Sequence, residues 1–274
     1  MTLAAAARSP RNPSPFTCVS IGLALVAALL VLAWPLSARA DDETGVLLVK
    51  SHKSYESPEH FLLEVRFGLY HPRVDADPSL NGATPYRDVF GDTANFEIAV
   101  EFDWLAYRIP HFGTIGPGFG AGYTEASALA PLLVPQPNGN TLSAESTSLT
   151  IFPMYAVAVL RADVIDRELH VPIVPYAKFG PAWGLWRASN SAGTSVADGR
   201  VGEGTTLGIQ GAVGLSLDLN ALDRAAARGF DNAMGVNHTY AFFEAYWADL
   251  SGIGQAHALD VGAYTWAAGL ALSF

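Results

Sequence analysis

The last eleven residues, 264–274, most constrain what this chain can fold into. Every second side chain from Tyr264 to Phe274 is apolar, whereas the alternate positions hold only small or mildly polar residues. A period of two residues is typical of a β-strand with one apolar face. At the end of a soluble protein such an aromatic-rich strand would expose a sticky edge. A strand whose apolar face meets lipid, and whose two edges are both paired, avoids this problem.

Residues 1–40 have the layout of a secretory signal peptide. A basic start with Arg8 and Arg11 precedes an apolar run, and Ala38-Arg39-Ala40 supplies a cleavage site of small residues. This order predicts export of the chain and removal of residues 1–40. A retained membrane anchor is the competing interpretation, because the apolar run is of borderline length. Pro35 and the cleavage site argue against it.

Removal of that segment changes the composition of the chain. The full sequence has 16 basic residues, 26 acidic residues, one cysteine and a net charge of −10. The segment contains three arginines, no acid and the cysteine, so the mature chain carries −13 and no thiol. Without a disulfide framework the fold must be held by burial or by a closed sheet. The acidic balance argues against nucleic acid as a partner.

Two segments of the mature chain alternate most regularly. Residues 61–70 place five apolar side chains on one face, with Glu64 and Arg66 on the other. Residues 95–104 do the same with three acids on the polar face: Glu97, Glu101 and Asp103. No apolar run after residue 40 approaches the roughly 20 residues of a membrane helix, so any membrane crossing must use strands. Apolar-out, polar-in alternation is the pattern of a small membrane barrel.

Six further strands are predicted, over about residues 112–123, 148–160, 173–186, 206–219, 238–248 and 259–274. The first of them has a row of glycines on one face, which leaves room for bulky neighbours or lets the sheet bend. Prolines lack a backbone donor, so we expect bulges or strand ends near Pro172, Pro175 and Pro181.

The connections between the strands alternate in length and polarity. Polar loops are predicted at residues 71–94, 124–146, 187–204 and 249–258. The other connections are predicted at 105–111, 161–172 and 220–237, the last with a short helix over 220–229. Long outer loops and shorter inner turns are typical of outer-membrane barrels.

The predicted fold class is therefore all-β. We expect a single closed antiparallel up-and-down transmembrane β-barrel of about eight strands over residues 61–274. A polar N-terminal arm over residues 41–60 would precede it. Gly45–Val49 within this arm is a candidate extra strand, and ten strands is the alternative count.

Two resemblances agree with this fold. Gly269, Leu272 and the final Phe274 resemble the C-terminal signal that the outer-membrane barrel-assembly machinery reads. The stretches HFLLEVRFGLYHPRVD and FEIAVEFDWLAYRIPHFGTIGPGFGAGY are similar to an uncharacterised outer-membrane β-barrel family known chiefly from myxobacteria. These resemblances imply an outer-membrane location, with membrane lipid and the assembly machinery as partners. They imply no activity.

An eight-stranded barrel is just wide enough inside for its own side chains. Alternation places a lumen charge cluster there, made of Glu64, Arg66, Glu97, Glu101, Asp103 and Lys178. Gln210, Asp218 and Glu244 are further inward candidates. Charges in a narrow lumen must pair or stay wet. We expect Arg66 and Lys178 to neutralise part of the Glu64, Glu97 and Glu101 charge and to plug the barrel. A cation path or a binding site is the alternative.

The sequence predicts no catalytic site, metal or cofactor. His111, His238 and Glu244 have no spacing that joins nucleophile, base and orienting carboxylate. Residues 116–122 are glycine-rich but lack the strand–turn–helix context of a nucleotide loop. The acids of the first outer loop lack a dense Ca²⁺ ligand pattern and are expected to be solvated: Asp75, Asp77, Asp88 and Asp92.

The expected role is structural or in surface interaction, for a barrel with a largely plugged lumen whose outer loops could meet an unknown extracellular ligand. A small porin-like pore or ligand carrier is the alternative. A lipid-modifying outer-membrane enzyme and a soluble exported lipocalin-like barrel are further alternatives.

Overall fold

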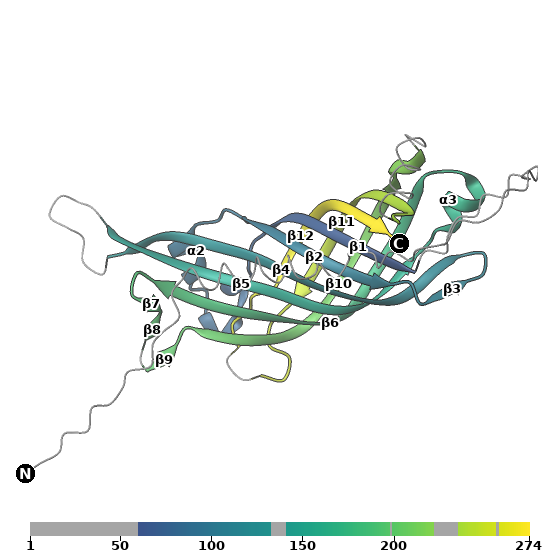
Figure 1. The fold of residues 1–274 in the computed structure, drawn as a ribbon. Helices are drawn as coiled ribbons and strands as arrows, with labels where there is room; N and C mark the ends of the chain where they lie inside the picture. The colour runs from purple at the N-terminus through teal and green to yellow at the C-terminus, as the bar shows by residue number, and fades with distance from the viewer. Residues whose placement is uncertain (1–59, 133–140, 198, 222–234, 256–257) are drawn as a thin grey trace, which may run out of the picture. The chain divides into compact units, whose positions relative to one another are not determined.

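The computed structural model of the chain describes residues 60–132, 141–197, 199–221, 235–255 and 258–274. The predicted signal peptide, the predicted arm up to residue 59 and most of the predicted helix over 220–229 lie outside these residues. The described part forms one antiparallel sheet of eight long strands that closes on itself (Figure 1). The long strands are β1 (Phe61–Tyr70), β2 (Asn95–Trp104), β4 (Gly113–Pro131), β5 (Leu142–Arg161), β6 (Ile173–Asn190), β10 (Glu203–Asp218), β11 (His238–Asp249) and β12 (Ala263–Ser273).

Each long strand pairs with the next one along the chain, and the barrel closes where β12 pairs with β1. This seam runs from Leu62 opposite Ser273 to Gly68 opposite Ala267. We call the end where β1 begins and β12 ends the terminal end, and the opposite end the loop end. The predicted fold class, a closed antiparallel barrel of eight strands, is confirmed, with two short strands joined to the same sheet.

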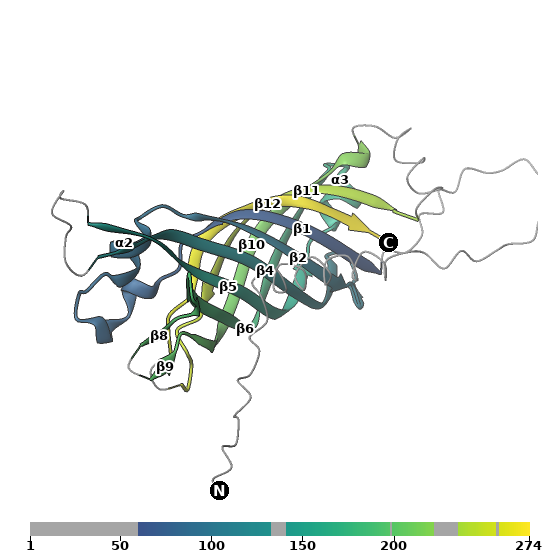
Figure 2. The same ribbon diagram turned by 60° about the vertical axis from the view of Figure 1, so that its left-hand side comes forward.

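The predicted loop at 124–146 was wrong, because β4 and β5 continue as a paired ribbon. Their register holds from Thr124 opposite Ile151 to Leu129 opposite Ser146. Figures 1 and 2 show this ribbon reaching beyond the ends of β1 and β12. The outward residues beyond Tyr123 are no longer regularly apolar, so the sequence looks like a loop. Backbone hydrogen bonds do not depend on that pattern and continue the ladder.

The remaining connections contain short elements. At the loop end, the first loop, between β1 and β2, contains two 3₁₀ turns and the helix α2. The third loop, between β6 and β10, contains short paired strands rather than an irregular coil. At the terminal end the connections contain one strand, one helix and one 3₁₀ turn. These elements are η1 (Val74–Ala76), η2 (Pro78–Leu80), α2 (Pro85–Phe90), β3 (Tyr107–Ile109), α3 (Val164–Leu169), β7 (Gly193–Thr194), β8 (Val196–Ala197), β9 (Arg200–Val201) and η3 (Leu219–Ala221). In the described ranges, no helix has the length and apolar character needed to span a bilayer.

The prolines of β6 disturb the sheet less than predicted. The strand begins at Ile173, directly after Pro172, as expected. The register between β6 and β10 nevertheless runs without a shift through Pro175 and Pro181, so the bulges predicted there were wrong. A proline removes one donor but keeps its carbonyl, and the carbonyl of Pro175 accepts from the Ala162 N–H at 2.8 Å.

The two faces of the wall differ in polarity. Large apolar side chains such as Phe67, Phe119 and Leu215 are exposed on the outside. Inside, buried apolar residues form a large cluster, which includes Tyr70, Val74, Tyr86, Leu250 and Val261 towards the loop end and extends along β5 to Val159. A separate terminal-end cluster contains Leu62, Val174, Tyr176, Tyr240, Phe242 and Ala271. The lumen charges lie beside these clusters, since Val159 of the first cluster stands opposite Lys178 on the neighbouring strand.

Candidate functional site

The lumen charge cluster occupies inward positions of β1, β2 and β6. All six residues are buried, each with 2% or less of its surface exposed. On β1 and β2 the register places Glu64 directly opposite Glu101. Successive side chains of a strand point to opposite faces, so the charges share the inside while their neighbours Leu63 and Val65 face outward. In this lumen, two-residue alternation alone was enough to place the cluster.

Lys178 lies at the centre of the polar contacts. Its Nζ donates to Glu64 Oε2 at 2.6 Å. The same atom lies 3.0 Å from Glu101 Oε1, an ion pair whose angle does not make a hydrogen bond, and 3.7 Å from Glu244 Oε2. Glu64 and Glu101 are two of the acids that Lys178 was expected to neutralise.

Arg66 has a different partner from those expected. Its Nη1 donates to Glu244 Oε1 at 2.6 Å, and no ion pair joins it to Glu64, Glu97 or Glu101 among the described residues. Its guanidinium also lies between two aromatic rings, 5.2 Å from the ring centre of Tyr155 and 4.9 Å from that of Tyr246. The correction has a simple cause: Glu244 is 178 residues away in the chain, and it comes close to Arg66 because β12 pairs with β11 on one side and with β1 at the seam on the other.

Three buried tyrosines complete the network. The Tyr155 hydroxyl donates to Glu101 Oε2 at 2.6 Å, and the Tyr176 hydroxyl donates to Glu244 Oε2 at 3.0 Å. The Tyr246 hydroxyl donates to Glu97. Hydrogen bonds to a charged acceptor are roughly twice as strong as neutral ones, so these hydroxyls stabilise the buried carboxylates. The sequence analysis missed them, although Tyr176 and Tyr246 stand two residues from Lys178 and Glu244 and therefore share their face.

The glycine row of β4 makes space for this network. A Cβ on Gly120 would lie 2.1 Å from Cζ of Tyr155, and a Cβ on Gly118 would lie 2.2 Å from Oδ1 of Asp103. The expectation that the row leaves room for bulky neighbours is confirmed. Asp103 itself is fully buried, and neither of its carboxylate oxygens has a hydrogen-bond partner among the described residues.

The loop end is closed by apolar side chains and backbone contacts. The Tyr70 hydroxyl donates to the Val261 carbonyl, and the N–H of Arg73 donates to the Gly262 carbonyl at 2.9 Å. In the first loop, the Asp75 carboxylate accepts from the N–H groups of Tyr86 and Arg87 at 2.8 and 2.9 Å and fixes the start of α2. The same loop carries Asp77, Asp88 and Asp92, the other acids expected to be solvated.

One carboxyl of the loop end is held in an unusual environment. Burial raises the pKa of Asp260 above its ordinary value of 3.8, and the hydrogen bond from the Gly262 N–H opposes that rise. The charge of Arg73 also favours the ionised form, whereas Asp249 and Asp77 disfavour it.

The residues weighed for catalysis are dispersed. His111 is exposed and lies 3.5 Å from Glu168. His238 Nδ1 lies 2.8 Å from Asp218 Oδ2 near the terminal end, whereas Glu244 belongs to the charge network. In the described chain, these groups do not form a constellation of nucleophile, base and orienting carboxylate.

The residues of the predicted assembly signal lie along the seam. Gly269 stands opposite Arg66 on β1, where a Cβ would lie 2.0 Å from the Val65 carbonyl oxygen. Leu272 faces outward and is partly exposed. Phe274 exchanges backbone hydrogen bonds with Phe61, at 2.9 and 3.1 Å. Gly269 and Phe274 thus have contacts in the folded barrel in addition to any role in assembly, which stays a prediction.

No family model and no curated protein matches the chain. Among solved structures, it is similar to Ail, the attachment invasion locus protein of Yersinia pestis, with 12% identity, a TM-score of 0.38 and coverage of 79% of this chain and 97% of that one. It is also similar to Neisserial surface protein A, with 11% identity, a TM-score of 0.36 and the same two coverages. For the N-terminal β-barrel domain of Pseudomonas aeruginosa OprF, the identity is 10%, the TM-score 0.32 and the coverage 79% and 100%. With these low scores, the description of the fold rests on the strand pairing of the chain itself.

Proposed function

We propose that this chain is an integral outer-membrane β-barrel with a structural or surface-interaction role, a largely plugged lumen and no enzymatic activity. The observation that carries the proposal is the inversion of polarity across the wall. Large apolar side chains are exposed on the outside, while charged residues are buried inside, among them the six of the lumen charge cluster and Glu244. A soluble lipocalin-like barrel would gain nothing from this arrangement, because its outer face meets water. A lipid environment makes the apolar outer face favourable.

Strand length and aromatic positions support the membrane assignment. β1 and β2 have ten residues each, within the roughly 9–11 residues of a tilted membrane strand. Exposed aromatic residues lie near both ends of the wall: Trp104 and Tyr107 at the terminal end, and Tyr264 and Trp266 towards the loop end. Aromatic girdles at both interfaces are typical of these barrels. The terminal end would face the periplasm and the loop end the exterior.

The plug follows from the contacts of the lumen. Lys178 and Arg66 are bonded to acids of three different strands, so they tie the wall together across its interior. Apolar clusters pack towards each end. A porin-like pore would instead need a continuous wet path. We therefore favour a closed barrel over the pore and the ligand carrier.

The proposed partners follow from this location. The exposed apolar wall would contact outer-membrane lipid, and the seam residues Gly269, Leu272 and Phe274 would be read by the barrel-assembly machinery before closure. Nucleic acid is not proposed as a partner, because the chain is acidic. The loop end would meet any extracellular ligand. Membership of the myxobacterial-type barrel family belongs to this proposal and rests on the two similar stretches.

Cell fractionation combined with a heat-modifiability gel tests the location. The proposal expects recovery in the outer membrane and a faster-migrating band in unheated samples. A periplasmic protein that stays soluble without detergent and shows no such band would contradict it.

Single-channel recording of the folded protein in a planar bilayer tests the plug. No steady openings are expected, whereas reproducible openings in wild type would favour the pore. The variant Arg66→Glu should also reduce the yield of the fast-migrating band, because it adds an acid beside Glu244. An unchanged yield would contradict the plug.

A further inference from the structure

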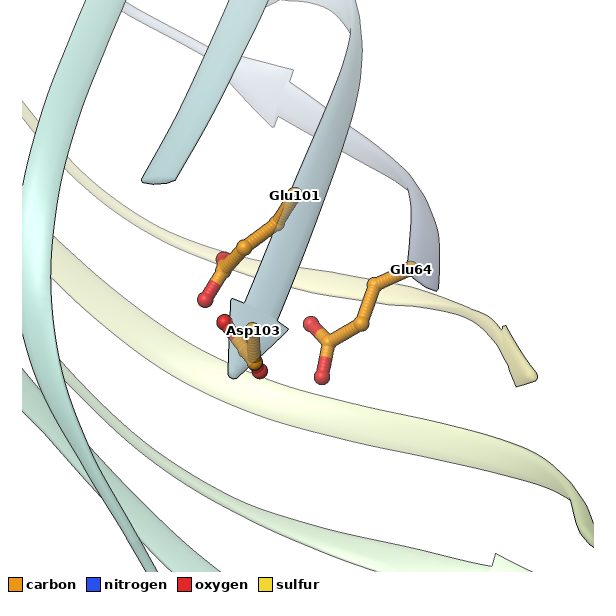
Figure 3. Close-up of side chains that lie close together, drawn as sticks. All are labelled: Glu64, Glu101 and Asp103. Atoms are coloured by element: carbon orange, nitrogen blue, oxygen red, sulfur yellow. The ribbon is translucent and has the colours of Figure 1, made fainter. Parts of the chain in front are cut away.

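Three buried carboxylates converge near the terminal end of the lumen. Glu64 on β1 and Glu101 and Asp103 on β2 each place one oxygen within 4.8 Å of the others. Figure 3 shows the three side chains pointing toward one another. The register explains the convergence, because Glu64 lies opposite Glu101, and Asp103 is the next inward residue of β2. We call these three residues the carboxylate triad.

Asp103 is the member of the triad whose charge the described residues do not satisfy. It is fully buried, and both of its carboxylate oxygens lack a hydrogen-bond partner in the described part of the chain. Lys178 forms ion pairs with Glu64 and Glu101, but none is found with Asp103. Opposite Asp103, Gly118 leaves the space that a Cβ would fill at 2.2 Å from Oδ1. The described residues thus make room for a carboxylate to which they supply no hydrogen-bond donor.

The charge balance points to the missing partner. If all three carboxyls of the triad are ionised, they face the single ammonium of Lys178, which leaves an excess of two negative charges on buried groups. Ionised groups are buried in proteins only when they are paired or coordinate a metal. A divalent cation would cancel this excess.

The ligand chemistry of the triad favours calcium among the hard divalent cations. Calcium binds oxygen ligands at about 2.3–2.6 Å in flexible geometry, which carboxylates on two neighbouring strands can supply without ideal symmetry. Magnesium demands a near-ideal octahedron at about 2.0–2.1 Å and dehydrates reluctantly. We propose that the Glu64–Glu101–Asp103 triad is a buried calcium site, in which Asp103 supplies the carboxylate that no described residue satisfies.

Lys178 and the calcium ion would share the same acids. Lys178 would remain the counter-charge of Glu64 and Glu101, and the ion would add the contact to Asp103. The two cations would repel each other, so removal of the ammonium should strengthen calcium binding. A triad with a merely structural role would not behave in this way.

Metal analysis of the refolded mature barrel tests the site. The protein is refolded in detergent with calcium chloride or with EGTA, separated from free ions by gel filtration, and its calcium is measured by atomic emission. Wild type refolded with calcium should hold one ion per folded barrel, and Asp103→Asn should hold none. Asp92→Asn is the matched control, because it removes the same charge from an exposed residue of the first loop. This control should retain the ion.

Each outcome of the experiment decides for or against the site. Folded wild type without calcium overturns the proposal, whatever the folding yield of the Asp103 variant, and would mean that the triad is neutralised by protons. Calcium that is kept in Asp103→Asn but lost in Asp92→Asn would place the ion in the first loop and also overturn it. In Lys178→Met, calcium should be released at least tenfold more slowly into EGTA than in wild type, and unchanged or faster release contradicts the shared site. A failure of the calcium site leaves the heat-modifiable band intact, so it is distinguishable from a failure of the proposed function.

Discussion

Replacing Lys178 by methionine tests the lumen network most directly. Methionine keeps much of the apolar stem but removes the ammonium that lies 2.6 Å from Glu64 and 3.0 Å from Glu101. Both carboxylates are 2% or less exposed, so water cannot readily replace it. Breaking a buried ion pair by removing one partner typically costs about 3–5 kcal/mol. Since a carboxylate can respond by taking up a proton, we expect a loss near the lower end, about 3 kcal/mol at neutral pH.

The assay is reversible urea unfolding of the barrel in detergent, with calcium removed by EGTA. The fast-migrating band and tryptophan fluorescence report the folded fraction, and the free energy of unfolding is obtained by linear extrapolation. Arg187→Met is the matched control, because Arg187 pairs with Glu203 at 3.2 Å on the surface, where both side chains are nearly half exposed. Such a pair contributes about 0–1 kcal/mol.

A double variant separates the ion pair from lost packing. If Glu64 is destabilising only because its counter-charge is gone, Glu64→Gln should restore part of the stability lost in Lys178→Met. A coupling of about 0.5–3 kcal/mol is typical for residues in contact. The reasoning is refuted if Lys178→Met costs no more than Arg187→Met, or if the two lumen substitutions are additive.

Three further predictions concern the wall, the lumen and the loop end. Leu270→Arg should lower the free energy of unfolding in lipid vesicles by about 2–4 kcal/mol, whereas Leu129→Arg on the projecting ribbon should cost about 0–1 kcal/mol; equal costs would contradict the lipid-facing wall. Gly120→Ala should cost about 1–3 kcal/mol in urea unfolding, because its Cβ would meet the ring of Tyr155, and an unchanged midpoint would contradict that packing. Asp260→Asn should raise the urea midpoint at pH 7, because the pKa of Asp260 is raised in the folded state and its ionised form therefore destabilises the fold once the pH rises through that pKa. The gain in midpoint should disappear below pH 3.8, where the carboxyl is protonated in both the folded and the unfolded state. A gain that persists there would contradict the pKa argument.

The sequence predicted the parts of the fold where an exposed apolar face alternates with a face turned to the lumen. β1 and β2 have the predicted bounds, because their outward apolar residues alternate with inward residues that are mostly small or charged, Leu62 and Tyr70 being the apolar exceptions on β1. The pattern fails outside that zone. Residues 125–131 of β4 are paired with β5, yet their outward side chains are mixed, so neither alternation nor apolar content marks them as a strand.

The members of the candidate site could be predicted, but not their pairing. Alternation places Arg66 and Lys178 in the lumen because the period of two is local. Which acid each one meets depends on the stagger between strands, and that stagger appears only when the barrel closes. Glu244 therefore came out as an inward residue but not as the partner of Arg66. The unsatisfied carboxylate of Asp103 is likewise invisible in the sequence, since it depends on where Lys178 ends.

The seam between β12 and β1 has a consequence for how such a barrel can form. The eight long strands of the barrel form eight neighbouring pairs. Seven of these pairs join strands that are consecutive in the chain, so each can form as a local hairpin. The eighth sets Leu62 beside Ser273, 211 positions later, and therefore closes the longest loop of the barrel. Until it forms, two strands expose unpaired N–H and C=O groups, which a bilayer interior does not tolerate. If the barrel enters a bilayer as proposed, the edges of β1 and β12 must therefore be shielded until the seam has formed.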